Sequence, residues 1–304
     1  MSAGSAETRW FAVLNPISGR GAAARDRASI ESAWRSHGLE LQIAVSEYAG
    51  HALPLIAQAL DAGARRIVAI GGDGTMQEAV NAIRQHGSAD DVILAPMPVG
   101  TGNDWCRSLA TPRDYRTVAA WCAAGKTRRV DIGFAEFADG DGSRHFVNVA
   151  GAGFDAYVIE QMPDRRFGVL AYLFAVLKGL AAYRPVAMRV RAESDTLDGR
   201  MFVAFACNGA YCGGGMHVAP PADLRDGLFD IVVIGDLGRL DVLASLRRLF
   251  DGTIAAHPRV KTLRAASLTI DGPERLAVEA DGELVGHTPV TLRVLPRALT
   301  VIAP

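Results

Sequence analysis

The stretch that decides the fold is Gly71-Gly72-Asp73-Gly74-Thr75. It follows an apolar run at positions 66–70, which is typical of a buried strand, and it precedes apolar residues spaced like the core face of a helix. A glycine-rich turn between a strand and a helix exposes main-chain N–H groups that bind anions. One carboxylate inside the turn, that of Asp73, would repel a phosphate unless it held a metal ion or accepted a proton. The stretch therefore predicts a phosphate-binding turn in which Asp73 has a chemical task.

The same stretch has the composition of a helix start. Thr75 and Glu78 are spaced as a capping box, in which two side chains bond main-chain N–H groups of the first helical turn. Thr101 and Asp104 have the same spacing. The alternative is a plain β-turn leading into a helix, because glycine pairs are common. Three glycines, an internal aspartate and a capping box together favour the phosphate site.

Strand and helix patterns alternate through the first part of the chain. We expect strands at 10–14, 39–45, 67–70 and 92–97, and helices at 22–37, 51–62, 75–85 and 115–124. This alternation is typical of an α/β domain with a doubly wound, mostly parallel sheet, whose ligands bind beyond the carboxyl ends of the strands.

Three turns at strand ends in this domain have the composition of anion-binding loops. They span 15–21, 71–75 and 98–104. Each alone fits an ordinary turn, because Gly, Asn, Pro and Asp populate turns anyway. The alternation brings all three to one edge of the sheet, which favours a nucleotide-binding cleft.

From about residue 128 strand patterns dominate. We expect strands at 129–137, 145–150, 187–192, 202–208, 229–234, 268–270, 276–280 and 290–295, and helices at 167–182 and 240–250. This predicts a mainly antiparallel β-sandwich domain at 128–304 after an α/β domain at 1–127, with the nucleotide cleft between them. A last strand at 299–303 fits a return to either domain.

Two Asp-Gly pairs punctuate the second domain. For Asp271-Gly272 we expect a type I′ hairpin turn. For Asp281-Gly282-Glu283, also in an expected hairpin, two neighbouring carboxylates suggest a site, and the spacing alone does not decide between a turn and a site.

The composition limits the classes of function. The chain has 304 residues, 49% of them apolar, and a formal net charge of −1, so no bulk basic surface argues for nucleic-acid binding. Its four cysteines form no Cys-x-x-Cys pair, and the first nine residues lack the apolar core of a signal peptide. We expect reduced thiols in a cytoplasmic protein.

An apolar segment at 167–183 raises the question of a membrane. It is shorter than the ~20 apolar residues of a spanning helix, and Lys178 interrupts it. We expect a core helix and no transmembrane segment. Contact with lipid at the inner membrane face is the alternative, because arginines flank the segment.

The ordered series of motifs resembles the diacylglycerol kinase catalytic-domain superfamily, which includes bacterial lipid kinases and sphingosine and ceramide kinases, and within it most of all the soluble bacterial type. The series runs nearly end to end and comprises Asn15-Pro16 with Ser18-Gly19, Gly71-Gly72-Asp73-Gly74-Thr75 with Glu78, Pro98-x-Gly100-Thr101-x-Asn103-Asp104, Asn148-x-x-Gly151-x-Gly153-x-Asp155-Ala156, Ala219-Pro220-x-Ala222-x-x-x-Asp226-Gly227, and Asp281-Gly282-Glu283 with Thr288-Pro289. Gln77 and Trp105 depart from the residues common at their positions, Asn and Phe, and no proposed acid is missing.

The resemblance implies an ATP-dependent lipid kinase, which transfers the γ-phosphate to a hydroxyl of diacylglycerol or a related lipid such as a sphingoid base. The implied nucleotide contacts are Asn15, Ser46, Gly71, Gly72, Asp73, Gly74, Thr75, Met76, Gln77, Thr101, Asn103 and Asp104. Asp73 would act near the phosphates through Mg²⁺. Asp281 and Glu283 would approach the acceptor hydroxyl, one of them as general base, with Glu283 favoured.

The resemblance also implies a second, structural Mg²⁺. Its ligands would be the side chain of Asp226 and the main chain of Asp223 and Leu228.

The sequence leaves two alternative functions open. One is a kinase of a soluble substrate such as NAD, since NAD kinases and phosphofructokinases share the glycine turn; the motifs of the second domain argue against it. The other is a non-catalytic nucleotide or lipid sensor, which the intact Asp73, Asp281 and Glu283 disfavour. The lack of a Gly-x-x-x-x-Gly-Lys-Ser/Thr sequence excludes a P-loop enzyme. The lipid, and the choice between monomer and homodimer, stay open.

Overall fold

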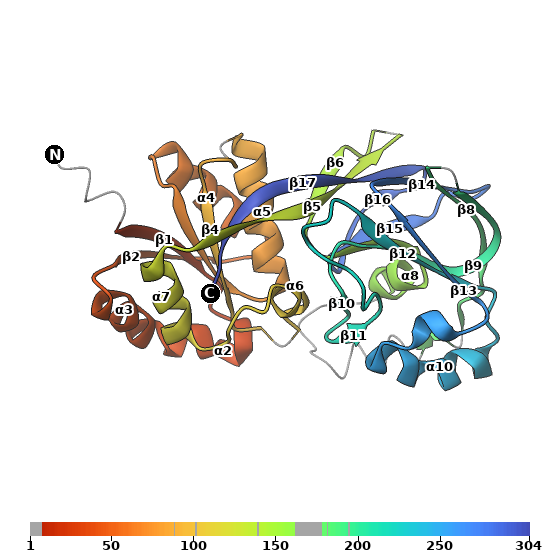
Figure 1. Ribbon diagram of the computed structural model, residues 1–304, viewed down its shortest axis with the longest axis horizontal. Coiled ribbons are helices and arrows are strands. Elements are labelled where there is room, and N and C mark those ends of the chain that lie inside the picture. Colours follow the sequence, from red (N-terminus) through yellow and green to blue (C-terminus); the bar gives the residue numbers. More distant parts are fainter. Residues whose placement is uncertain are drawn as a thin grey trace. The chain divides into compact units, whose positions relative to one another are not determined.

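The computed structural model describes residues 8–87, 89–100, 102–138, 140–161, 178–180, 182–193 and 195–304. They form two compact units (Figure 1). The first unit extends to Ile132 and takes in the segment from Pro296 onward, and the second unit is Gly133–Leu295. Two long strands, β5 (Thr127–Phe137) and β17 (Val290–Ile302), carry the chain from one unit to the other.

The first unit contains a parallel sheet with the strand order β2–β1–β3–β4–β17. Its own elements are β1 (Arg9–Leu14), α2 (Ser18–Arg25), α3 (Arg27–Ser36), β2 (Glu40–Val45), α4 (Ala52–Asp61), β3 (Arg66–Gly71), α5 (Asp73–His86), β4 (Ile93–Pro98), α6 (Asp104–Ser108) and α7 (Tyr115–Ala124). Because the parallel strands all run the same way, the loops that follow β1, β3 and β4 leave the sheet at one edge.

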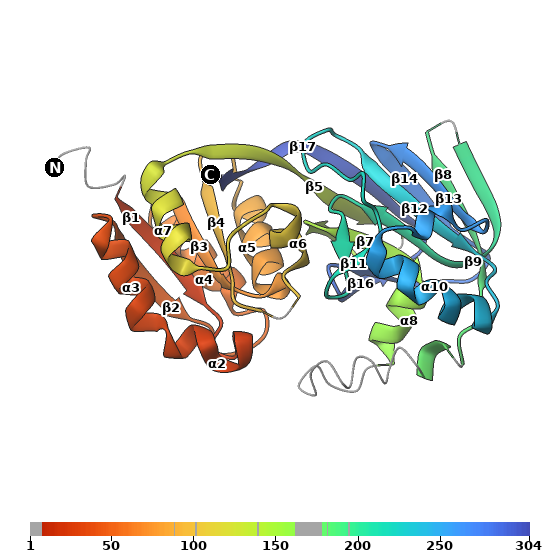
Figure 2. The ribbon, with the colours of Figure 1, turned by 60° about the horizontal axis from the view of Figure 1, so that its bottom comes forward.

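Helices cover both faces of this sheet. Trp10, Ala12 and Leu14 of β1 belong to one buried cluster with Trp34 of α3 and Val118 of α7, and Figure 2 shows these two helices beside each other on one side of the strands. Helices α4 and α5 pack against each other and contact β1 and β3. The burial of both faces explains why the strands read as apolar runs in the sequence.

The second unit is built from antiparallel strands. The order is β16–β15–β7–β9–β8–β14–β17, with β12 paired to β9 and β13 paired to β12. The elements are β6 (Ser143–Phe146), β7 (Val149–Gly153), α8 (Phe154–Glu160), β8 (Val186–Ala192), β9 (Asp195–Cys207), β10 (Tyr211–Cys212), β11 (Met216–His217), β12 (Phe229–Gly235), α10 (Arg239–Asp251), η2 (Ile254–Ala256), β13 (Val260–Ala265), β14 (Ser267–Asp271), β15 (Ala277–Ala280) and β16 (Glu283–His287).

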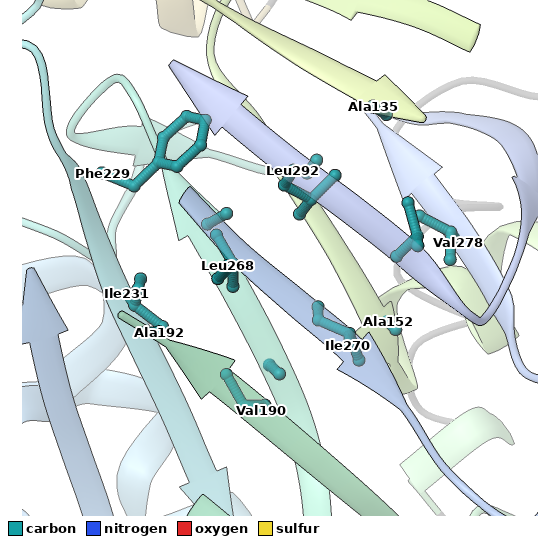
Figure 3. Close-up of a cluster of buried hydrophobic side chains, with 14 of the residues drawn as sticks. Ala135, Ala152, Val190, Ala192, Phe229, Ile231, Leu268, Ile270, Val278 and Leu292 are labelled. Carbon is teal, nitrogen blue, oxygen red and sulfur yellow. The ribbon is translucent and has the colours of Figure 1, made fainter. Parts of the chain in front are cut away.

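The core of the second unit lies between these strands. Figure 3 shows side chains from several strands meeting in one buried cluster, among them Val190 of β8, Phe229 of β12, Leu268 and Ile270 of β14, and Leu292 of β17. Along β8, buried and less buried residues alternate, as expected for a strand with one face on the core.

Some elements differ from the sequence-based expectation. The helix expected at 22–37 is divided into α2 and α3, because the backbone at Asp26 (φ −87°, ψ 1°) leaves helical geometry. The strands expected at 290–295 and 299–303 are one strand, β17. No expected strand or helix covered the ranges of β13, β16 and α8, although a hairpin was expected at Asp281-Gly282-Glu283. Most of the helix expected at 167–182 lies outside the described residues.

Among the helices that the structure describes, none combines the length and the apolar character needed to cross a bilayer.

Candidate active site

The three glycine-containing loops of the first unit contact one another at the carboxyl edge of the sheet. A Cβ atom on Gly19 would lie 2.5 Å from the carbonyl oxygen of Val99, and one on Gly100 would lie 2.6 Å from Cα of Gly72. The N–H of Val99 donates a 2.9 Å hydrogen bond to the carbonyl of Gly71. These close approaches leave no room for a side chain at Gly19 or Gly100. The prediction that the loops share one edge is confirmed.

The first loop is fastened to the second through Asn15. Its main-chain N–H donates to the carbonyl of Ile70 at 2.9 Å, and its Nδ2 donates to Oγ1 of Thr75 at 3.4 Å. A Cβ on Gly71 would lie 2.2 Å from Oγ1 of Thr75. Ser46 lies beside the end of β1, where its N–H donates to the carbonyl of Leu14 at 2.9 Å. Asn15, Ser46, Gly71 and Thr75 therefore lie around the ends of β1 and β3.

The expected capping box at Thr75 and Glu78 is wrong. Helix α5 begins at Asp73 with Gly72 as its N-cap residue, and no side chain caps it. Thr75 is thus already the third residue of the helix. The Glu78 carboxylate accepts two hydrogen bonds, of 2.9 and 3.0 Å, from main-chain N–H groups at the start of α4. The glutamate caps a neighbouring helix in space, which sequence spacing within one helix does not reveal.

The second expected capping box is also wrong, because α6 begins at Asp104 directly after Asn103. Asn103 has a left-handed backbone (φ 53°), and its Nδ2 donates to the carbonyl of Gly100. Asn103 and Asp104 are both buried. Thr101 lies outside the described residues.

Asp73 is the first residue of α5 and lies next to the start of α6. Its Oδ1 accepts a 3.4 Å hydrogen bond from the N–H of Trp105. Burial raises the pKa of the Asp73 carboxyl above its usual value, and the main-chain N–H groups of residues 103–105 lower it in part. A half-buried carboxylate beside loop N–H groups fits Mg²⁺, which binds through one or two protein carboxylates and completes its shell with phosphate oxygens and water.

The residues that follow Asp73 differ in how much space surrounds them. Met76 and Gln77 are fully buried, so their side chains form part of the interior. No atom lies within 4 Å of the position that a Cβ on Gly74 would take. Gly74 therefore leaves open space at the start of α5, where a phosphate can approach main-chain N–H groups.

In the second unit, Asp281-Gly282 is the two-residue turn of the β15–β16 hairpin. Both residues have positive φ (50° and 81°), as a type I′ turn requires, and Ala280 pairs with Glu283. The Asp281 carboxylate accepts main-chain hydrogen bonds of 2.7, 2.9 and 3.2 Å from residues 147–149. Asp281 therefore fastens the turn to the beginning of β7.

The type I′ hairpin expected at Asp271-Gly272 is wrong. Strand β14 ends at Asp271 and pairs with β8 and β17, while β15 pairs with β7 and β16. The two strands that flank this Asp-Gly pair are not partners, so no hairpin turn joins them. Type I′ geometry occurs instead at Asp281-Gly282.

Glu283, the residue after this turn, is partly exposed. Its Oε2 lies 3.3 Å from Nη2 of Arg144 on β6, and the two side chains are 30% and 28% exposed. The ion pair orients the carboxylate of a side chain that is still partly exposed. Sequence reasoning missed Arg144, because the short strand β6 was read as part of a longer one.

Two further buried acids in this unit, Asp155 and Glu279, were not assigned a role from the sequence. Glu279, in β15, lies next to the Asp281 turn, and Asp155, in α8, interacts with Glu279. Glu279 stands between buried apolar residues in β15. An acid in an inward-facing strand position is the signal that could have drawn attention to it.

Both oxygens of the Asp226 carboxylate have partners in the protein itself. Its Oδ1 accepts the N–H of Leu228 at 3.0 Å, and its Oδ2 is paired with Nη2 of Arg264. The carboxylate of Asp223 is paired with the neighbouring arginine. Within the described ranges, no group of three or more His, Cys, Asp or Glu side chains could hold a metal. The Arg264 guanidinium thus supplies the positive charge at Asp226, and a metal there stays a prediction.

Comparison with known proteins finds matches to both parts of the chain. The family model described as "Diacylglycerol kinase catalytic domain" matches residues 9–135, and the one described as "YegS C-terminal NAD kinase beta sandwich-like domain" matches residues 148–303. A protein named "Diacylglycerol kinase" from Mycobacterium tuberculosis (strain CDC 1551 / Oshkosh) is 29% identical over 297 residues, which cover 96% of this chain and 94% of the relative.

Two further matches extend the comparison. A protein named "Probable lipid kinase YegS-like" from Shewanella frigidimarina (strain NCIMB 400) is 28% identical over 280 residues, with 90% of this chain and 87% of the relative covered. A crystal structure of a diacylglycerol kinase from Bacillus anthracis str. Sterne superposes with a TM-score of 0.73 over 98% of this chain and 97% of that chain, at 22% identity. The structural match shows a shared fold.

Proposed function

We propose that this chain, which belongs to the family of lipid kinases with a diacylglycerol kinase catalytic domain and a YegS-type C-terminal domain, transfers the γ-phosphate of ATP to a hydroxyl group of a lipid. The observation that carries the proposal is the pair of acidic turns, one around Asp73 and one around Glu283. Phosphoryl transfer needs charge neutralisation at the phosphates and an oriented acceptor hydroxyl, and each turn suits one of these tasks.

The loops of the first unit are proposed to bind the nucleotide. Glycines 19, 72 and 100 bring the loop backbones close together, so that N–H groups and not side chains line the approach to the start of α5. Asp73 would hold Mg²⁺, which, when bound, neutralises charge on the phosphate oxygens. The contacts around Asn15 and Thr75 would keep the loops in place before the nucleotide arrives.

The turn of the second unit is proposed to serve the acceptor. Glu283 is the group that would take the proton from the hydroxyl, because its carboxylate reaches solvent while Arg144 orients it. Asp281 would keep the turn in position through its three main-chain hydrogen bonds. This division assigns the base to Glu283 and the anchoring of the turn to Asp281.

Diacylglycerol, or a related lipid such as a sphingoid base, is the proposed acceptor. The relative from Mycobacterium tuberculosis carries diacylglycerol in its name, and the family is one of lipid kinases. The substrate would be presented at a membrane surface, so the protein is proposed to act as a peripheral enzyme at the cytoplasmic side.

The test measures transfer of labelled phosphate from Mg-ATP to diacylglycerol and to a sphingoid base in mixed micelles. We expect turnover with one of these lipids and its loss when Mg²⁺ is removed with EDTA. A parallel reaction with NAD in detergent-free buffer tests the kinase of a soluble substrate. Phosphorylation of NAD without turnover of any lipid would replace the proposal.

A further inference from the structure

Two buried carboxyl groups lie side by side behind the proposed catalytic turn. Glu279 of β15 is 6% exposed, and both carboxylate oxygens of Asp155, in the first turn of α8, are buried. Each group changes the ionisation of the other, so their carboxyl groups are within direct interaction distance. The proposed reaction assigns no task to either.

A glycine makes this arrangement possible. Gly151 of β7 is the residue directly opposite Glu279 in the β7–β15 ladder. Residues directly opposite each other in a ladder have their side chains on the same face of the sheet. A Cβ on Gly151 would lie only 2.5 Å from Oδ2 of Asp155. The Asp155 carboxylate therefore occupies the space that a side chain at position 151 would need, beside Glu279.

The pair is connected to the catalytic turn by a hydrogen bond. Oε2 of Glu279 accepts the main-chain N–H of Gly282 at 2.8 Å. Gly282 is the second residue of the turn, Asp281 is the first, and Glu283 follows directly. A displacement of the Glu279 carboxyl group would thus move the residue next to the proposed general base.

The surroundings of the pair favour one shared proton. Burial raises the pKa of both carboxyl groups, that of Asp155 to about 6 and that of Glu279 well above its ordinary value, and the charge of Asp155 adds to the rise at Glu279. Neither oxygen of Asp155 accepts a hydrogen bond of normal geometry from the residues that the structure describes. A protonated Glu279 supplies the missing donor. The pair then carries one proton and one negative charge.

Among the residues that the structure describes, the other groups that face the pair do not neutralise this charge. Main-chain N–H groups of Asp155 and Ala156 at the start of α8 lower the pKa of Asp155. The pKa of the Tyr183 phenol is raised by burial and then by the charge of Asp155. The pKa of the Cys207 thiol is raised by burial, then by the charge of Asp230 and then by that of the pair. The carboxylate of Asp281 raises the pKa of Glu279. Neutral and acidic groups thus surround the pair, which favours retention of the proton.

We propose that Glu279 and Asp155 are positioning residues, which share one proton and thereby hold the Gly282 N–H and the Asp281–Gly282–Glu283 turn in place. The catalytic consequence rests on the proposed function, since it assumes that Glu283 meets the acceptor hydroxyl. The shared proton itself does not depend on that assumption.

The first experiment tests the proton without any kinase assay. Infrared spectra of the full chain near neutral pH should contain the band of a buried protonated carboxyl group, shifted in deuterated water and reduced in E279Q. The matched control is E193Q, which alters an exposed glutamate that also accepts one main-chain N–H, at 3.1 Å from Ala266; it should keep the band. A band of equal intensity in E279Q and the wild type would overturn the shared proton.

The second experiment tests positioning by kinetics. In E279Q the amide can accept the Gly282 N–H and donate to Asp155, so turnover should be retained. In E279V both bonds are lost, and kcat should fall about 10²-fold, as expected for a misplaced catalytic group, with an unchanged KM for ATP. Equal losses in E279Q and E279V would contradict positioning by these bonds.

The third variant, D155N, links the two acids. In the wild type, ionisation of Glu279 at alkaline pH removes the shared proton, so kcat should fall there. Removal of the Asp155 charge lowers the pKa of Glu279, so this fall should begin at lower pH in D155N, whereas E279Q should lack it. An unshifted pH profile in D155N would contradict the coupling. A wild type that shows the infrared band but phosphorylates no lipid would overturn the proposed function and support the shared proton.

Discussion

The main-chain N–H of Val147 donates a 2.7 Å hydrogen bond to Oδ2 of Asp281. The next two N–H groups along the chain donate to Oδ1 of the same carboxylate. A carboxylate that accepts three main-chain hydrogen bonds holds a turn strongly, since hydrogen bonds to charged groups are stronger than neutral ones. Glu283, two residues later, has an arginine partner and solvent access instead. One short turn therefore separates anchoring from the proposed proton transfer.

Asp281→Asn and Glu283→Gln should separate these two roles. Asp281→Asn turns one acceptor oxygen into an NH₂ group that faces an N–H donor, so the free energy of unfolding should fall by about 1–3 kcal/mol. Glu283→Gln should leave that free energy within about 0.5 kcal/mol of the wild type, while kcat falls by roughly 10²- to 10⁴-fold. Urea unfolding and steady-state kinetics measure the two quantities, and the reverse pattern would exchange the assigned roles.

Asp73→Asn should abolish phosphoryl transfer. The change keeps the shape of the side chain and removes the charge that is proposed to hold Mg²⁺, so kcat should fall roughly 10³-fold or more, because a bound metal contributes several kcal/mol to transition-state stabilisation. The control is Asp91→Asn at an exposed position before β4, for which we expect wild-type rates. A fully active Asp73→Asn variant would remove Asp73 from the mechanism.

The same substitution should change how stability depends on pH. Burial raises the pKa of Asp73 in the folded chain above its ordinary value of 3.8, which applies to the unfolded chain. The folded state therefore binds more protons than the unfolded state between these two pKa values, and stability falls as pH rises through this window. Asp73→Asn lacks this loss. Its urea midpoint should exceed that of the wild type at pH 7.5 by more than at pH 4.5, and a difference independent of pH would contradict the raised pKa.

Gly100→Ala should destabilise the loop edge of the first unit. The added methyl group would lie 2.6 Å from Cα of Gly72 and 2.9 Å from Oδ1 of Asn103, and such overpacking costs about 1–3 kcal/mol. Gly74→Ala is the matched comparison, since its methyl group would meet no atom within 4 Å and alanine favours a helix by about 0.5–1 kcal/mol. Thermal unfolding should show opposite shifts for the two variants.

Arg264→Gln should make the second unit responsive to Mg²⁺. The arginine pairs with Asp226 and lies 3.4 Å from Oδ1 of Asp230. Its removal leaves two neighbouring carboxylates without their cation, which should lower the melting temperature. Mg²⁺ without nucleotide should then raise the melting temperature of the variant and leave that of the wild type unchanged. A rise in the wild type would instead support the metal predicted at Asp226.

The sequence predicts those features that depend on neighbours along the chain. The apolar spacing around the glycine turn located β3 and α5, because burial periodicity is a local property. The partners of polar groups could not be predicted in this way. Glu78 caps a different helix, and the N–H groups that bind Asp281 come from residues more than 130 positions earlier.

The same reason explains the acids that sequence reasoning left without a role. Asp155 and Glu279 meet only because β7 and β15 are paired and Gly151 lacks a side chain. Arg264 lies on β13, a strand that the sequence did not reveal, and its contact with Asp226 requires the pairing of β12 with β13. Such partners follow from the register between strands, which composition and spacing do not specify.

The position of strand β17 at the end of the sequence has a consequence for folding during synthesis. Thr300 and Val301 pair with Ile93 and Leu94 of β4, so the sheet of the first unit gains its last strand from a segment that follows the entire second unit in the sequence. On the ribosome, the loops that we propose to bind the nucleotide therefore emerge long before the strand that completes their sheet. We expect nascent chains to carry an open strand edge at β4 throughout that interval, the period in which chaperones protect such edges.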